Sequence, residues 1–171
     1  MLRRTALLLA VACASCGPAP GDLHGELVWA ARGGDIGAIR RLASNRVDLD
    51  ASSPVAPRIV FPDLDHRDWT ALQHAVHKHQ VESVRVLLEW GADPDARGSG
   101  FTPLLIAAAG SETTMVKLLL DAGADIETSR KLAAQEPPGG PLWHVIERLG
   151  ESQSPKDALE RMLATPAPSR P

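Results

Sequence analysis

The stretch Thr70-Ala-Leu-Gln-His-Ala75 is repeated, with substitutions, as Thr102-Pro-Leu-Leu-Ile-Ala107, at an offset of 32 along the chain. The triplet Gly91-Ala-Asp93 is repeated as Gly123-Ala-Asp125 at the same offset. Self-similarity at a fixed period of this length is typical of repeat architectures, in which each repeat is one supersecondary unit. The chain therefore contains two clear copies of one structural unit, at about 65–96 and 97–128.

A related unit precedes these two copies. A shift of 45 along the chain aligns Ala30 with Ala75, Ile39 with Val84, Asp48 with Asp93 and Ala51 with Ala96. Because this shift exceeds the offset of 32 by 13, an insertion of that length, at about 52–64, separates the first unit, at about 25–51, from the second. A weaker fourth unit at about 139–165 begins with Pro141-Leu-Trp-His144.

The residue order within each unit predicts two helices. Thr70 and Thr102 are suited to cap the first helix, and Pro103 fits just inside its start because the missing N–H would be unpaired there. Gly91 and Gly123 supply the left-handed residue that commonly ends a helix. Apolar residues recur at the spacing of one face of the second helix, namely Val84, Leu87, Leu88, Val116, Leu119 and Leu120. No unit can bury this face alone, so the units are expected to stack.

These motifs resemble those of ankyrin-repeat proteins. The family signature TPLHxA is matched by TALQHA at 70–75 and TPLLIA at 102–107, and the family's GAD turn occurs unaltered at 91–93 and 123–125. The first unit has Arg46 in place of the turn glycine, and Trp143 stands where the family has histidine. The resemblance implies an all-α fold, a short solenoid of three to four helix-pair repeats with hairpin fingers, at residues 25–165. A disordered tail is expected at 166–171.

The first residues of the chain have the pattern of an export signal. Arg3 and Arg4 provide a positive start, residues 5–12 are apolar but too few to span a bilayer, and small residues precede Cys16. A signal peptide is expected at 1–15 and a Pro/Gly-rich tether at 16–24. Cysteine in this place resembles the lipobox of bacterial lipoproteins, which implies a lipid on Cys16 or, alternatively, on Cys13. The remaining interpretation is an ordinary signal peptide with incidental cysteines.

In lipoproteins of this kind, aspartate after the lipid-bearing cysteine is associated with retention at the inner membrane. Ala14 and Gly17 follow the two candidate cysteines here. The resemblance therefore implies a periplasmic protein anchored by lipid to the outer membrane.

Composition and motifs argue against several other functions. The net charge of −3 is too small to suggest a nucleic-acid partner, and the absence of cysteine from the folded part excludes a disulfide framework. No G-x-S-x-G, H-E-x-x-H or phosphate-binding glycine loop occurs. The aspartates occupy turn positions, where a carboxylate bonds local backbone: Asp48, Asp50, Asp93, Asp95 and Asp125. We expect a monomer that is not an enzyme and needs no cofactor.

The resemblance also implies where a partner protein binds, because ankyrin proteins commonly meet partners on the fingers and the exposed end of each first helix. By register, the residues presented there are His66, Arg67, Trp69, His77, Lys78 and Phe101. Exposed aromatic rings beside basic groups have the composition of a binding hot spot. The alternative is that Trp69 and Phe101 cover neighbouring hairpins. Ile59, Val60 and Phe61 form an apolar tip in the insertion, which either folds back or reaches for a partner, and Arg58, Ile59 and Phe61 are its candidate binding residues.

Location and a basic-aromatic face suggest a specific role, an immunity protein that blocks a delivered toxin. One alternative is an accessory or chaperone-like factor for a periplasmic enzyme. Another is a protein that binds a metal or small ligand through the cluster from His66 to His79, in which His74 and His77 have the spacing of one helix face. The repeat register places His74 at an inward, normally apolar position and His79 in a turn, so packing is favoured and no metal site is expected.

Overall fold

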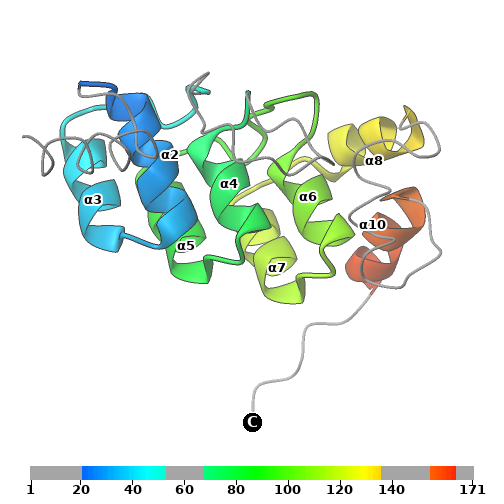
Figure 1. Ribbon diagram of the computed structural model, residues 1–171. Coiled ribbons are helices and arrows are strands. Elements are labelled where there is room, and N and C mark those ends of the chain that lie inside the picture. The colour runs from blue at the N-terminus through cyan, green and yellow to red at the C-terminus, as the bar shows by residue number, and fades with distance from the viewer. Residues whose placement is uncertain (1–20, 53–67, 136–154, 165–171) are drawn as a thin grey trace, which may run out of the picture.

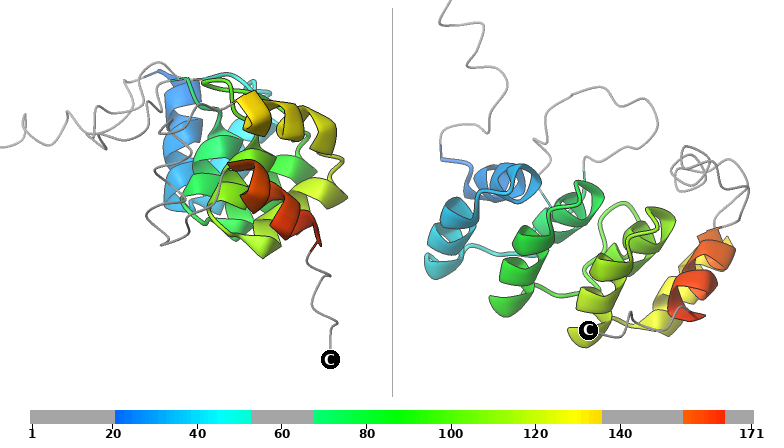
Figure 2. Two further views of the ribbon diagram at one scale, coloured as in Figure 1. Left: turned by 90° about the vertical axis from the view of Figure 1, so that its right-hand side faces the viewer. Right: turned by 90° about the horizontal axis from the view of Figure 1, so that it is seen from below.

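The computed structural model describes residues 21–52, 68–135 and 155–164, which form helices arranged in pairs (Figure 1). The pairs are α2 (Leu23–Gly33) with α3 (Ile36–Ser44), α4 (Ala71–His77) with α5 (Val81–Glu89), and α6 (Pro103–Ala109) with α7 (Thr113–Asp121), followed by α8 (Ile126–Gln135) and α10 (Pro155–Ala164). Figure 2 shows α2, α4 and α6 in one layer and α3, α5 and α7 in a second. The described residues contain isolated bridges but no strand, and the expected all-α stack is confirmed.

The backbone repeats with the two offsets found in the sequence. Residues with positive φ follow the first helix of each pair at intervals of 45 and then 32, namely Gly34 (78°), His79 (58°) and Ser111 (56°). The same intervals separate those that follow the second helix, namely Arg46 (57°), Gly91 (92°) and Gly123 (93°). Glycine adopts this conformation more readily than any other residue. The left-handed conformation therefore occurs at fixed positions of the repeat, even where the residue there is not glycine.

Thr70 and Thr102 cap the first helices of the second and third units as the sequence indicated, whereas α5 and α7 begin without a side-chain cap. Thr70 Oγ1 accepts a hydrogen bond from the backbone N–H of Gln73 (3.3 Å), and Thr102 Oγ1 accepts one from Leu105 (3.2 Å). In the first unit Asp35 has this role for α3, since its Oδ1 accepts from the N–H of Ala38 (2.9 Å). Caps satisfy N–H groups that have no partner within the helix. They matter here because helices this short are marginal without external support.

The core lies between the two layers of helices. Four residues of the apolar stripe predicted on the second helices are buried, namely Val84, Leu87, Val116 and Leu119, and Leu88 and Leu120 are partly buried against the core. Ala75 and Ala107 are also buried, which allows the first helices of neighbouring units to approach closely. Burying one Leu or Val side chain contributes about 1.5–3 kcal/mol. Much of this contact is made between units, so the stability of each pair depends on its neighbours.

The C-terminal end differs from a simple continuation of the repeat. The repeat comparison did not anticipate α8, which begins three residues after Gly123. The later segment of the predicted fourth unit lies in α10, which packs against α6 and α8. Arg130 of α8 binds Glu160 of α10 through two contacts, Nε–Oε1 at 2.6 Å and Nη2–Oε2 at 3.0 Å. The Glu160 carboxylate, with that of Glu127, raises the pKa of Arg130 above its usual value. This ion pair helps to fix α10 at the end of the stack.

Several predicted segments lie outside the described residues: the signal peptide at 1–15, the first part of the tether, residues 53–64 of the insertion, the fourth unit before Pro155, and the tail. None of the described helices is both long enough and apolar enough to cross a membrane.

Candidate functional site

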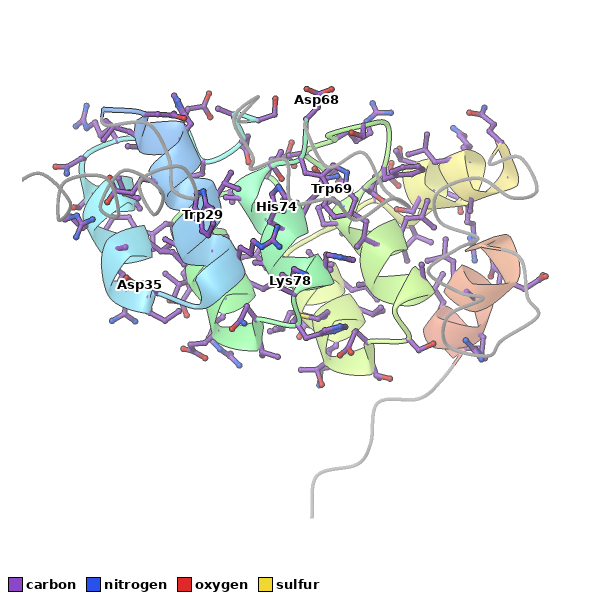
Figure 3. All side chains as sticks on the ribbon, viewed as in Figure 1. Trp29, Asp35, Asp68, Trp69, His74 and Lys78 are labelled. Atoms are coloured by element: carbon purple, nitrogen blue, oxygen red, sulfur yellow. The ribbon has the colours of Figure 1, made fainter. Side chains whose placement is uncertain are left out.

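The candidate site is the face presented by the first helices and the residues that precede them. We call it the inner face and define it by its half-buried residues Trp29, Arg32, His77, Lys78 and Phe101, together with the buried Trp69 and His74 that pack among them. Repeat register relates its members, since Trp29, His74 and Ile106 share one position and Arg32, His77 and Ala109 share another. Figure 3 shows Trp29 on α2 and His74 on α4 at a similar level, with Trp69 beside His74 and Lys78 near the end of α4.

Trp69 is buried, and its expected exposure as a hot-spot residue is wrong. Its relative exposure is 1%. The ring centroid lies 5.6 Å from that of His74, and His77 meets the ring edge-on at 5.4 Å and 84°. Trp69 directly precedes the capping residue Thr70, and His74 is the fourth residue of α4, so the two side chains form the staple contact that fixes the entry of a chain into a helix. Trp69 therefore covers α4 of its own unit, and not a neighbouring hairpin as the alternative interpretation expected.

His77, Lys78 and Phe101 are half-buried on the inner face. His77 and Lys78 lie at the C-terminal end of α4, where positive charge is favoured by the helix dipole. Phe101 has the same place before α6 as Trp69 has before α4, and it packs partly against the core. The other predicted binding residues lie outside the described part of the chain: Arg58, Ile59, Phe61, His66 and Arg67.

The histidines of the proposed metal cluster are in different surroundings. His74 is buried at the inward position that the register indicated. His79 is in the turn after α4, and its Nδ1 lies 2.7 Å from Oε1 of Glu112. In the residues that the structure describes, no three His, Cys, Asp or Glu side chains lie together in a way that could hold a metal ion. His66 lies outside those residues.

Sequence reasoning missed two members of the inner face, Trp29 and Arg32. Both are half-buried on α2, and Arg32 is in its last turn. The signal that could have found them is the repeat register, because the shift that relates the first unit to the second carries Trp29 onto His74 and Arg32 onto His77. The family motifs are clearest in the second and third units, and the predicted binding residues come from those units and from the insertion before them.

Gln73 connects the second unit to the finger of the third and was also missed. Its buried amide is fully paired: Oε1 accepts from the N–H of Thr70 (2.9 Å) and Gly98 (3.0 Å), and Nε2 donates to the carbonyls of Gly98 (3.1 Å) and Phe101 (2.8 Å). The Thr-x-x-Gln spacing is a capping-box pattern that the sequence does contain. The bonds to Gly98 and Phe101 hold the finger that leads to α6, and thus position Phe101.

The aspartates form a ladder along the turns between units. Asp48, Asp93 and Asp125 bond local backbone as predicted, each accepting from the N–H two residues on (2.8–3.0 Å). Asp50 and Asp95 instead reach the next unit, where they accept from the N–H of Asp93 (2.9 Å) and Asp125 (2.9 and 3.0 Å). These carboxylates therefore have a structural role, and part of it is to connect successive units.

The pKa values of Asp50 and Asp125 are shifted in opposite directions. Burial raises the pKa of Asp50, so folding disfavours its ionised form and protonation at acidic pH relieves that cost. The hydroxyl of Thr128 and the N–H of Glu127 lower the pKa of Asp125. The contribution of Asp125 is therefore present above the ordinary carboxyl pKa and is lost as the pH falls through its lowered value.

Comparison with known proteins places this geometry among repeat proteins. Residues 27–130 match the family model for ankyrin repeats (3 copies), which is more than half of the 171-residue chain. A putative ankyrin repeat-containing protein of Treponema pallidum is 38% identical over 74 residues, 42% of this chain and 25% of that protein. The transient receptor potential cation channel subfamily A member 1 of Homo sapiens is 40% identical over 63 residues, 36% of this chain and 6% of that protein.

The glycerophosphocholine phosphodiesterase gde1 of Schizosaccharomyces pombe is 36% identical over 67 residues, 38% of this chain and 6% of that protein. The chain thus spans a quarter or less of the length of these curated relatives. The likeness is confined to segments of 63 to 74 residues, about two repeat units each.

Proposed function

Because the chain belongs to the ankyrin-repeat family, we propose that it is a non-catalytic module that binds another protein in the bacterial cell envelope. Ankyrin repeats are in general protein-interaction modules without enzymatic activity. The observation that supports a binding site on this chain is the inner face. There, half-buried basic and aromatic side chains occur on the first helices of the first two units, α2 and α4, which pack against each other.

The location is the part of the proposal that rests on sequence alone. Arg3 and Arg4, the apolar run at 5–12 and the small residues before Cys16 have the order of an export signal. A lipid on Cys16 would leave five residues, 17–21, before the capping residue Asp22 of α2. A fully extended segment of this length spans roughly 20 Å. In this proposal the first unit is therefore held close to the periplasmic face of the outer membrane.

Fatty-acid labelling tests the anchor. We expect the full chain, expressed in a bacterium that processes lipoproteins, to incorporate an alkyne-tagged fatty acid. Cys16→Ala is expected to lose the label completely and to leave the membrane fraction, because the thiol that carries the lipid is absent. Cys13→Ala is the matched control and keeps its label. The reverse pattern would assign the lipid to Cys13, and an unlabelled wild-type chain would contradict lipid anchoring.

Within this proposal, the most specific role is that of an immunity protein that neutralises a toxin delivered to the envelope. It predicts that the bound protein is a toxin and that cells lacking the chain are sensitive to it. An accessory factor for a periplasmic enzyme predicts co-purification with that enzyme and no protection.

The binding step is tested by photo-crosslinking in the cell, because the reactive group can be placed on the inner face itself. Benzoylphenylalanine at position 78 samples that face, and benzoylphenylalanine at position 90 samples an exposed site at the end of α5 in the other layer. Mass spectrometry of the crosslinked product identifies the partner and so separates the toxin from the enzyme.

A further inference from the structure

Trp29 and Arg32 give the first unit a surface that the third unit lacks. They lie three residues apart on α2 and so share one side of that helix, and both are half-buried. Arg32 has no ion-pair or hydrogen-bond partner among the described residues. The Nε1 atom of Trp29 is buried and also lacks a partner there. The surface therefore presents the ring of Trp29 and the guanidinium group of Arg32, which is not part of an ion pair with a described residue.

The repeat register extends this surface from α2 to α4. The position of Arg32 is occupied by His77 in the second unit, and Lys78 follows it at the end of α4. The corresponding residues at the end of α6 are Ala109 and Gly110, which carry no charge. Since α2 and α4 pack against each other, Arg32 and the basic residues at the end of α4 lie on neighbouring helices.

Carboxylates are nearly absent from the helices that form this surface. Within α2, α4 and α6 the single carboxylate is that of Glu26, and it is paired with Arg41 of α3. The exposed acids that flank these helices along the chain are Asp35, in the turn after α2, and Asp68, in the finger before α4. The Oδ1 atom of Asp35 accepts a hydrogen bond from the N–H of Ala38 at the start of α3. Although the whole chain has a net charge of −3, the residues that define the inner face include Arg32 and Lys78 and no carboxylate.

We infer that this surface binds a partner segment in which carboxylates alternate with apolar side chains. The carboxylates lie against Arg32 and the end of α4, and an apolar side chain covers the ring of Trp29. Arginine forms short, paired hydrogen bonds with carboxylates, which adds geometric selectivity to charge attraction. Clusters of tryptophan and arginine are also typical of binding hot spots. The inference rests on the proposed function, because it specifies the chemistry of the partner.

Titration with two matched peptides tests the inference. The full chain, made by cell-free synthesis with 15N-labelled tryptophan, has four indole signals, and those of Trp29 and Trp90 are assigned with Trp29→Phe and Trp90→Phe. The peptides are acetyl-Ser-Glu-Leu-Glu-Leu-Ser-amide and its glutamine counterpart. We expect the glutamate peptide to shift the Trp29 signal and not the Trp90 signal. It should bind about fivefold more tightly than the glutamine peptide, the upper range for one exposed ion pair.

Charge variants identify the contact. In Arg32→Gln the preference for the glutamate peptide is expected to fall to about twofold, because the ion pair with Arg32 is removed and the contact with the end of α4 remains. Arg40→Gln is the matched control, since it removes the same charge from an exposed site on α3, and it keeps the full preference. Thermal unfolding of both variants checks that the fold is unchanged.

Equal affinity for the two peptides would overturn the inference, as would an unchanged preference in Arg32→Gln or a shift of Trp90 in place of Trp29. A shift of Trp29 by vesicles of phosphatidylglycerol, with none by the peptide, would also overturn it and assign the surface to an anionic membrane. If these tests fail while position 78 still crosslinks to one protein in the cell, the proposed function stands and the partner's chemistry is different.

Discussion

Gly98→Ala is expected to destabilise the protein by about 3 kcal/mol, one of the larger effects available to a single methyl group. A Cβ atom at this position would lie 1.9 Å from the carbonyl oxygen of Asp68 and 2.6 Å from Oε1 of Gln73. Both neighbours are fixed, since Asp68 contributes backbone and the Gln73 amide is held by its own hydrogen bonds. The finger of the third unit must then move away from the second unit, which breaks the contact between them.

Denaturant unfolding of the full chain, followed by circular dichroism, measures this change. Gly110→Ala is the matched control because its Cβ would meet only ordinary contacts, the nearest at 3.5 Å, and its φ of −78° suits any residue. We expect the control to remain within about 0.5 kcal/mol of the wild type. Equal stability of Gly98→Ala and Gly110→Ala would show that the finger is not packed against the second unit as described.

Gln73→Ala is expected to cost about 3 kcal/mol, since it leaves buried backbone groups of Thr70, Gly98 and Phe101 without partners. The wild-type amide uses both of its donors and both acceptor directions in this site. The groups of Thr70 and Gly98 are shielded from water because both residues are buried, and Phe101 is half-buried. The lost hydrogen bonds join the second unit to the third. The free energy of unfolding is therefore expected to fall, and unfolding is expected to become less cooperative.

Two further substitutions at position 73 separate hydrogen bonding from packing. Gln73→Leu keeps the volume and supplies the residue found at the equivalent position of the third unit, Leu105, yet it is expected to cost about 2 kcal/mol because the backbone groups stay unpaired. Gln73→His restores the residue of the family signature and is expected to recover part of that loss. The measurement is the free energy of unfolding in urea. A leucine variant as stable as the wild type would show that the amide does not brace the finger.

Most of the fold could be predicted from the sequence, because the repeat register shows where each helix pair begins and ends. The two offsets between units placed the turns, and the backbone repeats at those same intervals even where Arg46 or His79 adopts positive φ. Local sequence signals were sufficient to predict the helix pairs, because capping residues, apolar spacing and helix ends recur from unit to unit. α8 was not predicted, since it lies where the repeat pattern degenerates and depends on contacts with α6 and α10.

The candidate site was harder to predict from the sequence, because the repeat register gives the position of a residue in its unit and not the direction of its side chain. Trp69 occupies a finger position in the repeat, yet its ring packs over α4 against His74 and His77. The direction of the Trp69 ring depends on its contact with His74, the fourth residue of α4. A comparison of single positions between units does not take this contact into account. Gln73 shows the same limit in another form: its capping box is local, whereas its bonds to Gly98 and Phe101 join residues 25 and 28 positions apart.

The burial of Trp69 changes which substitutions can test binding. Trp69→Ala removes a fully buried ring and is expected to destabilise the fold by about 3–5 kcal/mol, so a loss of binding in that variant would say nothing about the surface. Lys78 is half-buried and Trp90 is 46% exposed. Substitution at these two positions is expected to leave the core intact, and together they sample the two layers of the stack.

Photo-crosslinking at these two positions tests most directly the claim that the inner face binds another protein. The full chain is expressed in its bacterial envelope with benzoylphenylalanine at position 78 or at position 90, and is irradiated in intact cells. The account predicts one discrete crosslinked protein from position 78 and none, or far less of it, from position 90. No crosslinked protein at position 78, or the same product in equal amount from both positions, would contradict it.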